Sequence, residues 1–113
     1  MSPITTHVLD TARGLPAAGV GIVLERQQDA AWQLIGRGET DDDGRQRALV
    51  PDGVAAPAGV YRLRFDTRTY FAAQSMIAFF PEITVMFEVA EGRPHHHVPL
   101  LLSPFGYTTY RGS

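Results

Sequence analysis

Short runs of alternating apolar and polar residues dominate the chain and predict β-strands. In the clearest run, Tyr61, Leu63 and Phe65 alternate with two arginines. A period of two places such apolar side chains on one face of a half-buried strand. Glycines and prolines separate the runs, which is typical of a β-sandwich or barrel. The predicted strands cover residues 5–10, 19–25, 32–39, 45–50, 60–65, 83–89, 96–103 and 107–110.

Two details of this pattern can be checked separately. Residues 13–16 are expected to form a turn, and Trp32, Leu34 and Gly36 are expected on one face of their strand. Between residues 70 and 79 the alternation stops, and the helix formers of residues 72–76 predict a short helix there. The helix is expected to end before Pro81, because the residue before a proline disfavours helical geometry.

Composition narrows the class of protein. With 113 residues the chain is expected to form one domain, residues 1–113. It has no cysteine, which excludes disulfides, thiolate metal sites and cysteine nucleophiles. It has no lysine, since every Lys or Arg position is arginine, which excludes a lysine Schiff base and a lysine general base. The net charge of −2 argues against general nucleic-acid binding. No apolar run reaches the roughly 18 residues of a membrane span.

A cytoplasmic location is expected. Residues 1–7 contain neither a basic segment nor an apolar one, so they do not resemble a secretory signal. Trimming of a signal, and a periplasmic or peroxisomal location, stay open.

Histidines are the most conspicuous candidates for chemistry. In an extended strand His95 and His97 share a face and His96 points the other way. Such a pair suits acid–base work near neutrality, and a His-x-His pair also suits a metal ion. No acidic residue lies close enough in sequence to complete a metal site, and an accidental cluster is the third interpretation. His7 is either structural or, if it lies near His97, able to activate a water jointly with it.

Two further segments are ambiguous. Arg45 follows an acidic run and Gly44, so it is either a surface residue paired with those acids or a planar donor aimed at a substrate oxygen. Residues 107–113 stay β-branched and aromatic to the end, which predicts an edge strand or a tail docked into the structure. There is no Gly-x-Ser-x-Gly elbow, no glycine-rich phosphate loop and no Walker motif, so the serine-hydrolase, dinucleotide-binding and NTPase classes are not indicated.

Taken together, these motifs resemble one family over essentially the whole chain, the 5-hydroxyisourate hydrolases or transthyretin-related proteins. The terminal tetrapeptide and the two histidine motifs are the specific features, and His96 departs from the aromatic residue usual at its position. The similar segments are Thr5-Thr6-His7-Val8-Leu9-Asp10, Thr40 with Asp43-Gly44-Arg45, Phe79-Phe80-Pro81-Glu82, His97-Val98-Pro99-Leu100-Leu101-Leu102-Ser103-Pro104 and Tyr110-Arg111-Gly112-Ser113.

The resemblance implies an all-β, transthyretin-like sandwich of two four-stranded sheets with one short α-helix. It implies a homotetramer, a dimer of dimers, with active sites at the dimer–dimer interface. The implied reaction is hydrolysis of 5-hydroxyisourate to 2-oxo-4-hydroxy-4-carboxy-5-ureidoimidazoline by general acid–base activation of water, without metal or cofactor. The implied catalytic residues are His7, Arg45, His97, Tyr110 and Ser113, with His7, Arg45 and Tyr110 also binding substrate.

Three other functions account for parts of the sequence: a hormone carrier, a structural β-sandwich module and a metal site. Vertebrate transthyretin, a thyroid-hormone carrier, shares the implied fold but lacks the histidine–arginine set and the Tyr-Arg-Gly-Ser end. Carboxypeptidase-regulatory β-sandwich modules resemble residues 14–20, 40–45 and 57–63, yet they do not account for the helix or for His97. A metal site at His95 and His97 would predict stoichiometric zinc.

Overall fold

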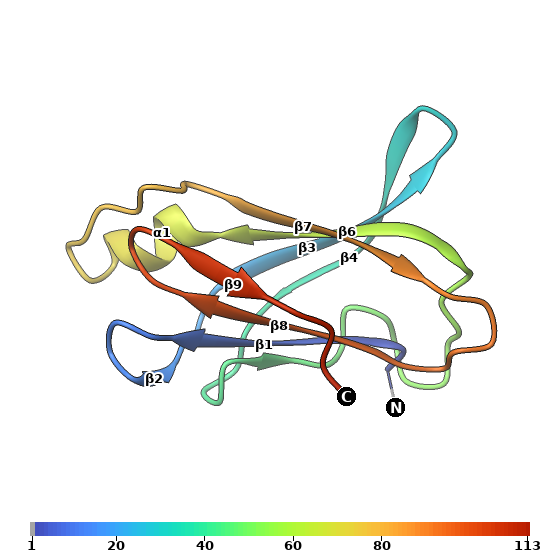
Figure 1. Cartoon of the computed structure of the whole chain (residues 1–113), viewed down its shortest axis with the longest axis horizontal. Coiled ribbons are helices and arrows are strands. Elements are labelled where there is room, and N and C mark those ends of the chain that lie inside the picture. The colour runs from blue at the N-terminus through green and yellow to red at the C-terminus, as the bar shows by residue number, and fades with distance from the viewer. Residues whose placement is uncertain (1) are drawn as a thin grey trace.

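Two β-sheets lie face to face with one short helix at one end (Figure 1). The computed structural model describes residues 2–113. The first sheet has the order β2-β1-β8-β9, with β5 also paired to β1, and the second has the order β4-β3-β6-β7. β1 and β8 run parallel to each other. The first sheet comprises β1 (Ile4–Asp10), β2 (Leu15–Pro16), β5 (Arg45–Gln46), β8 (His96–Leu102) and β9 (Tyr107–Thr109), and the second β3 (Gly21–Gln28), β4 (Ala31–Glu39), β6 (Gly59–Asp66) and β7 (Ile83–Val89).

This architecture confirms the predicted transthyretin-like β-sandwich. The first sheet has five strands, not four, because β2 and β5 are separate short strands that both pair with β1. The segment at residues 13–16 is therefore not only a turn, since Leu15 and Pro16 pair with the end of β1. β5 is shorter than predicted because only Arg45 and Gln46 pair with β1.

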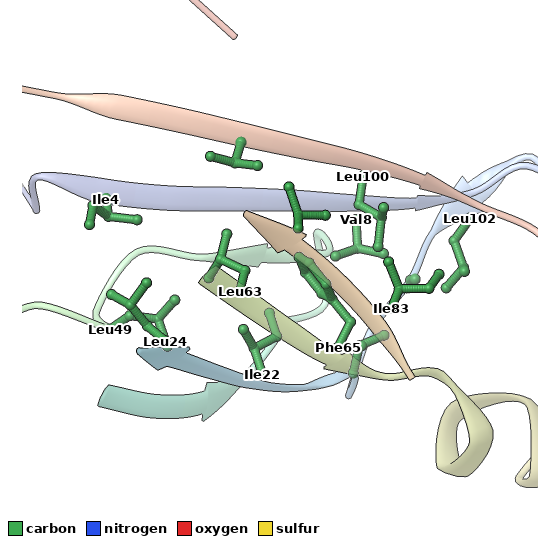
Figure 2. Packing of buried hydrophobic residues seen from close by; sticks show 14 of the residues in the cluster. Ile4, Val8, Ile22, Leu24, Leu49, Leu63, Phe65, Ile83, Leu100 and Leu102 are labelled. Atoms are coloured by element: carbon green, nitrogen blue, oxygen red, sulfur yellow. The ribbon is translucent and has the colours of Figure 1, made fainter. Parts of the chain in front are cut away.

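The core lies between the sheets and follows the predicted alternation (Figure 2). Ile4 and Val8 of β1 and Leu100 of β8 are fully buried against Leu63 and Phe65 of β6. Each fully buried side chain of this kind contributes about 1.5–3 kcal/mol relative to exposure. Because side chains alternate, Thr5 and His7 of β1 and His97 of β8 face outward, away from the core.

The helix α1 (Thr67–Ala72) begins three residues earlier than predicted and is also shorter. Its start is set by Asp66, whose carboxylate accepts hydrogen bonds from the Thr69 N–H at 3.1 Å and from the Thr69 hydroxyl at 2.7 Å. Ala73 caps the end of the helix, and Ser75 adopts a φ of 59° in the turn that follows. The propensity of residues 72–76 did not reveal the Asp66 cap. Within residues 2–113 no helix is long and apolar enough to cross a membrane.

The predicted common face of Trp32, Leu34 and Gly36 is only partly correct. Leu34 pairs with Glu25 but Gly36 pairs with Leu24, so a β-bulge separates the two residues and turns Gly36 to the other face. Trp32 and Leu34 share the outer face of the second sheet, where Leu34 is 48% exposed. The bulge lets the intervening Ile35 pack against the core.

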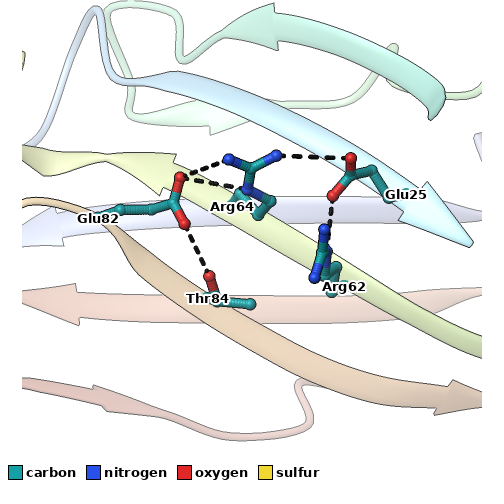
Figure 3. A network of polar contacts seen from close by, with 5 residues as sticks. All are labelled: Glu25, Arg62, Arg64, Glu82 and Thr84. Atoms are coloured by element: carbon teal, nitrogen blue, oxygen red, sulfur yellow. Dashed lines mark hydrogen bonds and ion pairs between the residues drawn. The ribbon is translucent and has the colours of Figure 1, made fainter. Parts of the chain in front are cut away.

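An ion-pair network covers the outer face of the second sheet (Figure 3). Glu25 accepts from Arg62 at 2.6 Å and contacts Arg64 at 3.5 Å, and Arg64 donates to Glu82 at 2.9 Å. The hydrogen bonds from Arg64 and from the Thr84 hydroxyl lower the pKa of the Glu82 carboxyl. The alternation of β6 therefore places both arginines opposite the core residues, as predicted, and this face is occupied by mutual charge pairing.

Asp10 ties the end of β1 to the helix. Its buried carboxylate accepts the backbone N–H groups of Ala12 and Arg13, each at 3.1 Å, and the Tyr70 hydroxyl at 2.7 Å. We expect Asp10→Ala to lower the free energy of unfolding by about 3 kcal/mol, and Tyr70→Phe by about 1 kcal/mol. The first change leaves three donors without their acceptor, among them the buried Tyr70 hydroxyl, whereas the second leaves the carboxylate its two backbone donors. Urea denaturation measures both. A smaller loss for Asp10→Ala than for Tyr70→Phe would show that the carboxylate is not the anchor.

Candidate active site

Strand pairing brings three distant segments of sequence onto the outer face of the first sheet. In the parallel β1–β8 pair, Thr5 lies opposite His97 and His7 opposite Pro99. On the other edge of β1, His7 lies opposite Arg45 of β5. Diagonal neighbours on adjacent strands lie roughly 7–8 Å apart, within reach of long side chains. The predicted proximity of His7, Arg45 and His97 therefore follows from the register.

A tight turn places Arg45 at the start of β5. The Asp41 carboxylate accepts the backbone N–H groups of Asp43 and Arg45, each at 2.9 Å, and these bonds lower the pKa of Asp41. Gly44 has a φ of 77°, and a Cβ there would stand 2.3 Å from the Val8 carbonyl oxygen, so the turn requires glycine. Asp41 thus holds the backbone of Arg45, and Arg45 lines a cavity.

That cavity has a volume of about 800 Å³ and lies over the outer face of β1, beside β5 and β8. Three of the five predicted site residues line it together, namely Arg45, His97 and Ser113. The other lining residues are Ser2, Thr5, Thr6, Arg47, Ala48, Asp52 and His95. Sequence reasoning missed Thr5, Arg47 and Asp52, because only the strand pairing and the loop after β5 show that they face this space.

His7 lies between Arg45 and β8 but is not one of the cavity-lining residues. Its Nε2 lies 2.8 Å from the carbonyl oxygen of Asp43. Because a carbonyl only accepts, Nε2 carries the proton and Nδ1 is the nitrogen left for another partner. The acidic turn therefore fixes the ring as well as the neighbouring arginine.

His97 is held on two sides. Its Nδ1 lies 2.8 Å from the Thr5 hydroxyl, and its carbonyl accepts the Gly112 N–H at 2.8 Å. A Cβ at Gly112 would stand 2.6 Å from the imidazole Cδ2, so the tail passes directly against the ring. The C-terminal segment is thus both an edge strand and a docked tail. Burial, followed by the charges of Arg45, His7 and His95, lowers the pKa of His97.

Tyr110, like His7, is a predicted site residue that does not line the cavity within one chain. It is 57% exposed and lines a second groove of about 270 Å³, whose lining includes Met86, Arg111 and also His97. The role implied for Tyr110 by the family resemblance therefore stays a prediction.

His96 faces the opposite way from its two neighbours, as the alternation predicts. It is 6% exposed, and its Nδ1 has no hydrogen-bond partner within the described part of the chain. Its Nε2 accepts a long hydrogen bond of 3.4 Å from the Ala90 N–H. Burial, followed by the charges of Arg93, His95 and Arg111, lowers the pKa of His96.

This buried imidazole gives folding stability a pH dependence. Since the pKa of His96 is lower folded than unfolded, the unfolded state binds the proton more readily, and stability falls as pH drops through the unfolded value of about 6.5. We expect His96→Phe to lose less stability than the unsubstituted protein between pH 7 and pH 5. Urea denaturation at several pH values measures this, and an equal loss in both proteins would contradict it.

Comparison with known proteins assigns the family. The model of the HIUase/Transthyretin family matches residues 4–112. A curated 5-hydroxyisourate hydrolase of Salmonella dublin is 49% identical over 110 residues, covering 97% of this chain and 80% of the relative.

Solved structures of both branches of the family share the fold. The 5-hydroxyisourate hydrolase of Klebsiella pneumoniae superposes with a TM-score of 0.86 at 34% identity, covering 100% of both chains. Sea bream transthyretin in complex with thyroxine superposes with a TM-score of 0.89 at 37% identity, covering 97% of this chain and 94% of that one. The fold alone does not separate enzyme from carrier, whereas the family is shown by the match along almost the whole chain. This chain belongs to the HIUase/Transthyretin family.

Proposed function

We propose that this protein is a hydrolase that opens the ring of 5-hydroxyisourate in urate degradation, forming 2-oxo-4-hydroxy-4-carboxy-5-ureidoimidazoline. The observation that carries the proposal is the convergence of Arg45 and His97 on one cavity, with His7 beside both. Relatives from Salmonella and mouse, 49% and 44% identical, are named 5-hydroxyisourate hydrolase.

His97 is the proposed general base. Because its pKa is lowered, the ring is neutral at pH 7, and its Nδ1 is already engaged with Thr5. Nε2 is then the atom that removes a proton from a water held between His97 and His7. The water oxygen attacks the ring carbonyl, the carbonyl oxygen becomes an oxyanion, and the water proton passes to His97. Such proton transfer typically contributes 10²–10⁴-fold to the rate.

Arg45 cannot act as a base, because a guanidinium stays protonated and only donates hydrogen bonds. Its proposed role is to stabilise negative charge. It lines the cavity with His97 and offsets the charge that develops on the carbonyl oxygen. When the oxyanion collapses, the ring C–N bond breaks and the proton on His97 passes to the leaving nitrogen. Ser113, which also lines the cavity, and Tyr110 are proposed to orient the substrate.

The proposed reaction needs no metal. Nε2 of His95 and Nδ1 of His97 both point at the Thr5 hydroxyl, within 2.9 Å, and not at a common open position. We therefore expect exhaustive dialysis against EDTA to leave the rate of hydrolysis unchanged, with or without added zinc. A loss of activity that zinc restores would contradict the metal-free mechanism and favour a site at these two histidines.

The proposed assembly is a homotetramer, a dimer of dimers with the cavities at the dimer–dimer interface. Exposed apolar side chains support self-association, since Ile77, Phe79 and Phe105 are 87%, 70% and 79% exposed. Phe79 and Phe105 lie close together, because the Phe79 N–H donates to the Pro104 carbonyl at 2.7 Å. Light scattering should give four times the 12.4 kDa chain mass, and a monomer would contradict this assembly.

The competing function is hormone binding, because the structure resembles a transthyretin in complex with thyroxine. Urate oxidase can generate 5-hydroxyisourate from urate in the cuvette, and its ultraviolet absorbance then reports its decay. We expect micromolar protein to accelerate the decay well beyond the spontaneous rate. If the protein bound thyroxine and did not accelerate the decay, the proposed hydrolase function would be wrong and a carrier function would take its place. The cytoplasmic location stays a prediction, which cell fractionation would test.

A further inference from the structure

The Thr5 hydroxyl lies between two histidine rings and is hydrogen-bonded to both. Its Oγ1 is 2.9 Å from Nε2 of His95 and 2.8 Å from Nδ1 of His97. The two rings share the outer face of the first sheet with their centroids 6.4 Å apart, and Thr5 beneath them is 7% exposed. Of these three residues only His97 takes a proton in the proposed reaction, and Thr5 and His95 exchange none with the substrate.

The single proton of the Thr5 hydroxyl links the tautomers of the two histidine rings. A hydroxyl has one proton, so Thr5 donates to one ring nitrogen and accepts from the other. With both rings neutral, two arrangements make both hydrogen bonds. In the first, Nδ1–H of His97 donates to Thr5 and Thr5 donates to Nε2 of His95. In the second, Nε2–H of His95 donates to Thr5 and Thr5 donates to Nδ1 of His97. The tautomer of one histidine therefore fixes that of the other.

The charge in the cavity selects between them. The first arrangement leaves a lone pair on Nε2 of His97, and the second puts an N–H there. The charged groups that line the cavity with His97 are Arg45, Arg47, Asp52 and the terminal carboxylate of Ser113. Among them Arg45 acts on His97, since its positive charge contributes with those of His7 and His95 to the lowered pKa of this ring, and a guanidinium carries only N–H donors. A lone pair is attracted by a nearby cation whereas an N–H is repelled by it, so the first arrangement is the more stable.

We propose that Thr5 and His95 are positioning residues that hold His97 as its Nδ1–H tautomer, so that Nε2 presents its lone pair to the cavity. The proposal rests on the proposed function and deepens it, because this lone pair is the base of that reaction. When Nε2 takes up a proton, Nδ1–H still donates to Thr5 and Thr5 still donates to His95. The chain of hydrogen bonds thus serves the neutral ring and the imidazolium without rearrangement.

Imidazole ¹⁵N chemical shifts of the intact protein test the tautomer directly, because a protonated and an unprotonated ring nitrogen resonate far apart. His97 is assigned from the signals lost in His97→Gln, at a pH where the ring is neutral. We expect a protonated Nδ1 and an unprotonated Nε2 in the unsubstituted protein. Thr5→Val should move His97 toward the Nε2–H form, whereas Thr5→Ser and the opposite-facing control His96→Phe should not. An Nε2–H form of His97 in the unsubstituted protein would overturn the proposal.

Kinetics supply the second measurement. Thr5→Val should lower kcat roughly tenfold without changing KM, since it removes part of the 10²–10⁴-fold available from acid–base catalysis. Thr5→Ser, which keeps the hydroxyl, should restore the rate. Equal kcat values for Thr5→Val and Thr5→Ser would overturn the positioning role. If the unsubstituted protein did not hydrolyse 5-hydroxyisourate, the proposed function would fail, while the ¹⁵N shifts would still decide the tautomer.

Discussion

Replacing His97 by glutamine should lower kcat for 5-hydroxyisourate by 10²–10⁴-fold. Glutamine fills a similar volume and can hydrogen-bond to Thr5, but it cannot take a proton from water. Because the strand continues through buried Val98 and Leu100, the variant is expected to fold and to keep its oligomeric mass. Stopped-flow absorbance at saturating substrate measures kcat separately from KM.

His96→Phe is the matched control for this substitution. The neighbouring ring faces the other side of the sheet and is buried, so its loss should change kcat little. If His97→Gln retained close to the full rate, His97 would not be the base. If both variants lost activity equally, the effect would come from the strand and not from the imidazole.

Replacing Arg45 by alanine should also cause a large loss of kcat. Removing one donor to a developing oxyanion typically costs 10²–10³-fold in kcat, and Arg45 lines the cavity together with His97. Arg45→Lys should recover only part of this loss, because an ammonium lacks the planar fork of a guanidinium. Substrate-saturated rates of both variants give the measurement.

The matched control for charge is Arg37→Ala, on the second sheet. Arg37 lines a groove with Gly21 and Glu39, and its removal changes the net charge by the same amount. We expect Arg37→Ala to retain the full rate. A similar loss in both alanine variants would show that long-range charge, and not a local donor, explains the Arg45 effect.

Much of the fold could be predicted from the alternation of residues. The strand at Tyr61, Leu63 and Phe65 is half-buried as expected, because its pattern depends only on which face meets the core. The bulge that separates Leu34 from Gly36 could not be predicted, since it depends on pairing with a strand elsewhere in the chain. Propensity alone also placed the helix too late, because the Asp66 cap determines where it starts.

The site could be predicted only in part. The family motifs indicated His7, Arg45 and His97, and the strand register brings them to one face. The shared hydroxyl of Thr5 left no signal in the sequence, because a threonine in a strand is ordinary and its contacts depend on the β1–β8 register. Alternation did place His95 on the face of His97, and that was the available hint that His95 belongs to the site.

The handedness of the product tests the central claim most directly. The hydroxyl-bearing carbon of 5-hydroxyisourate is a stereocentre that opening of the ring at the neighbouring carbonyl leaves untouched. A chiral cavity that holds the substrate through His7, Arg45 and His97 therefore turns over one of its two enantiomers in preference to the other. Circular dichroism during turnover should therefore show one enantiomer forming with the unsubstituted protein, and no such signal with Arg45→Ala or His97→Gln at the same concentration. A racemic product formed at the spontaneous rate by the unsubstituted protein would contradict the account.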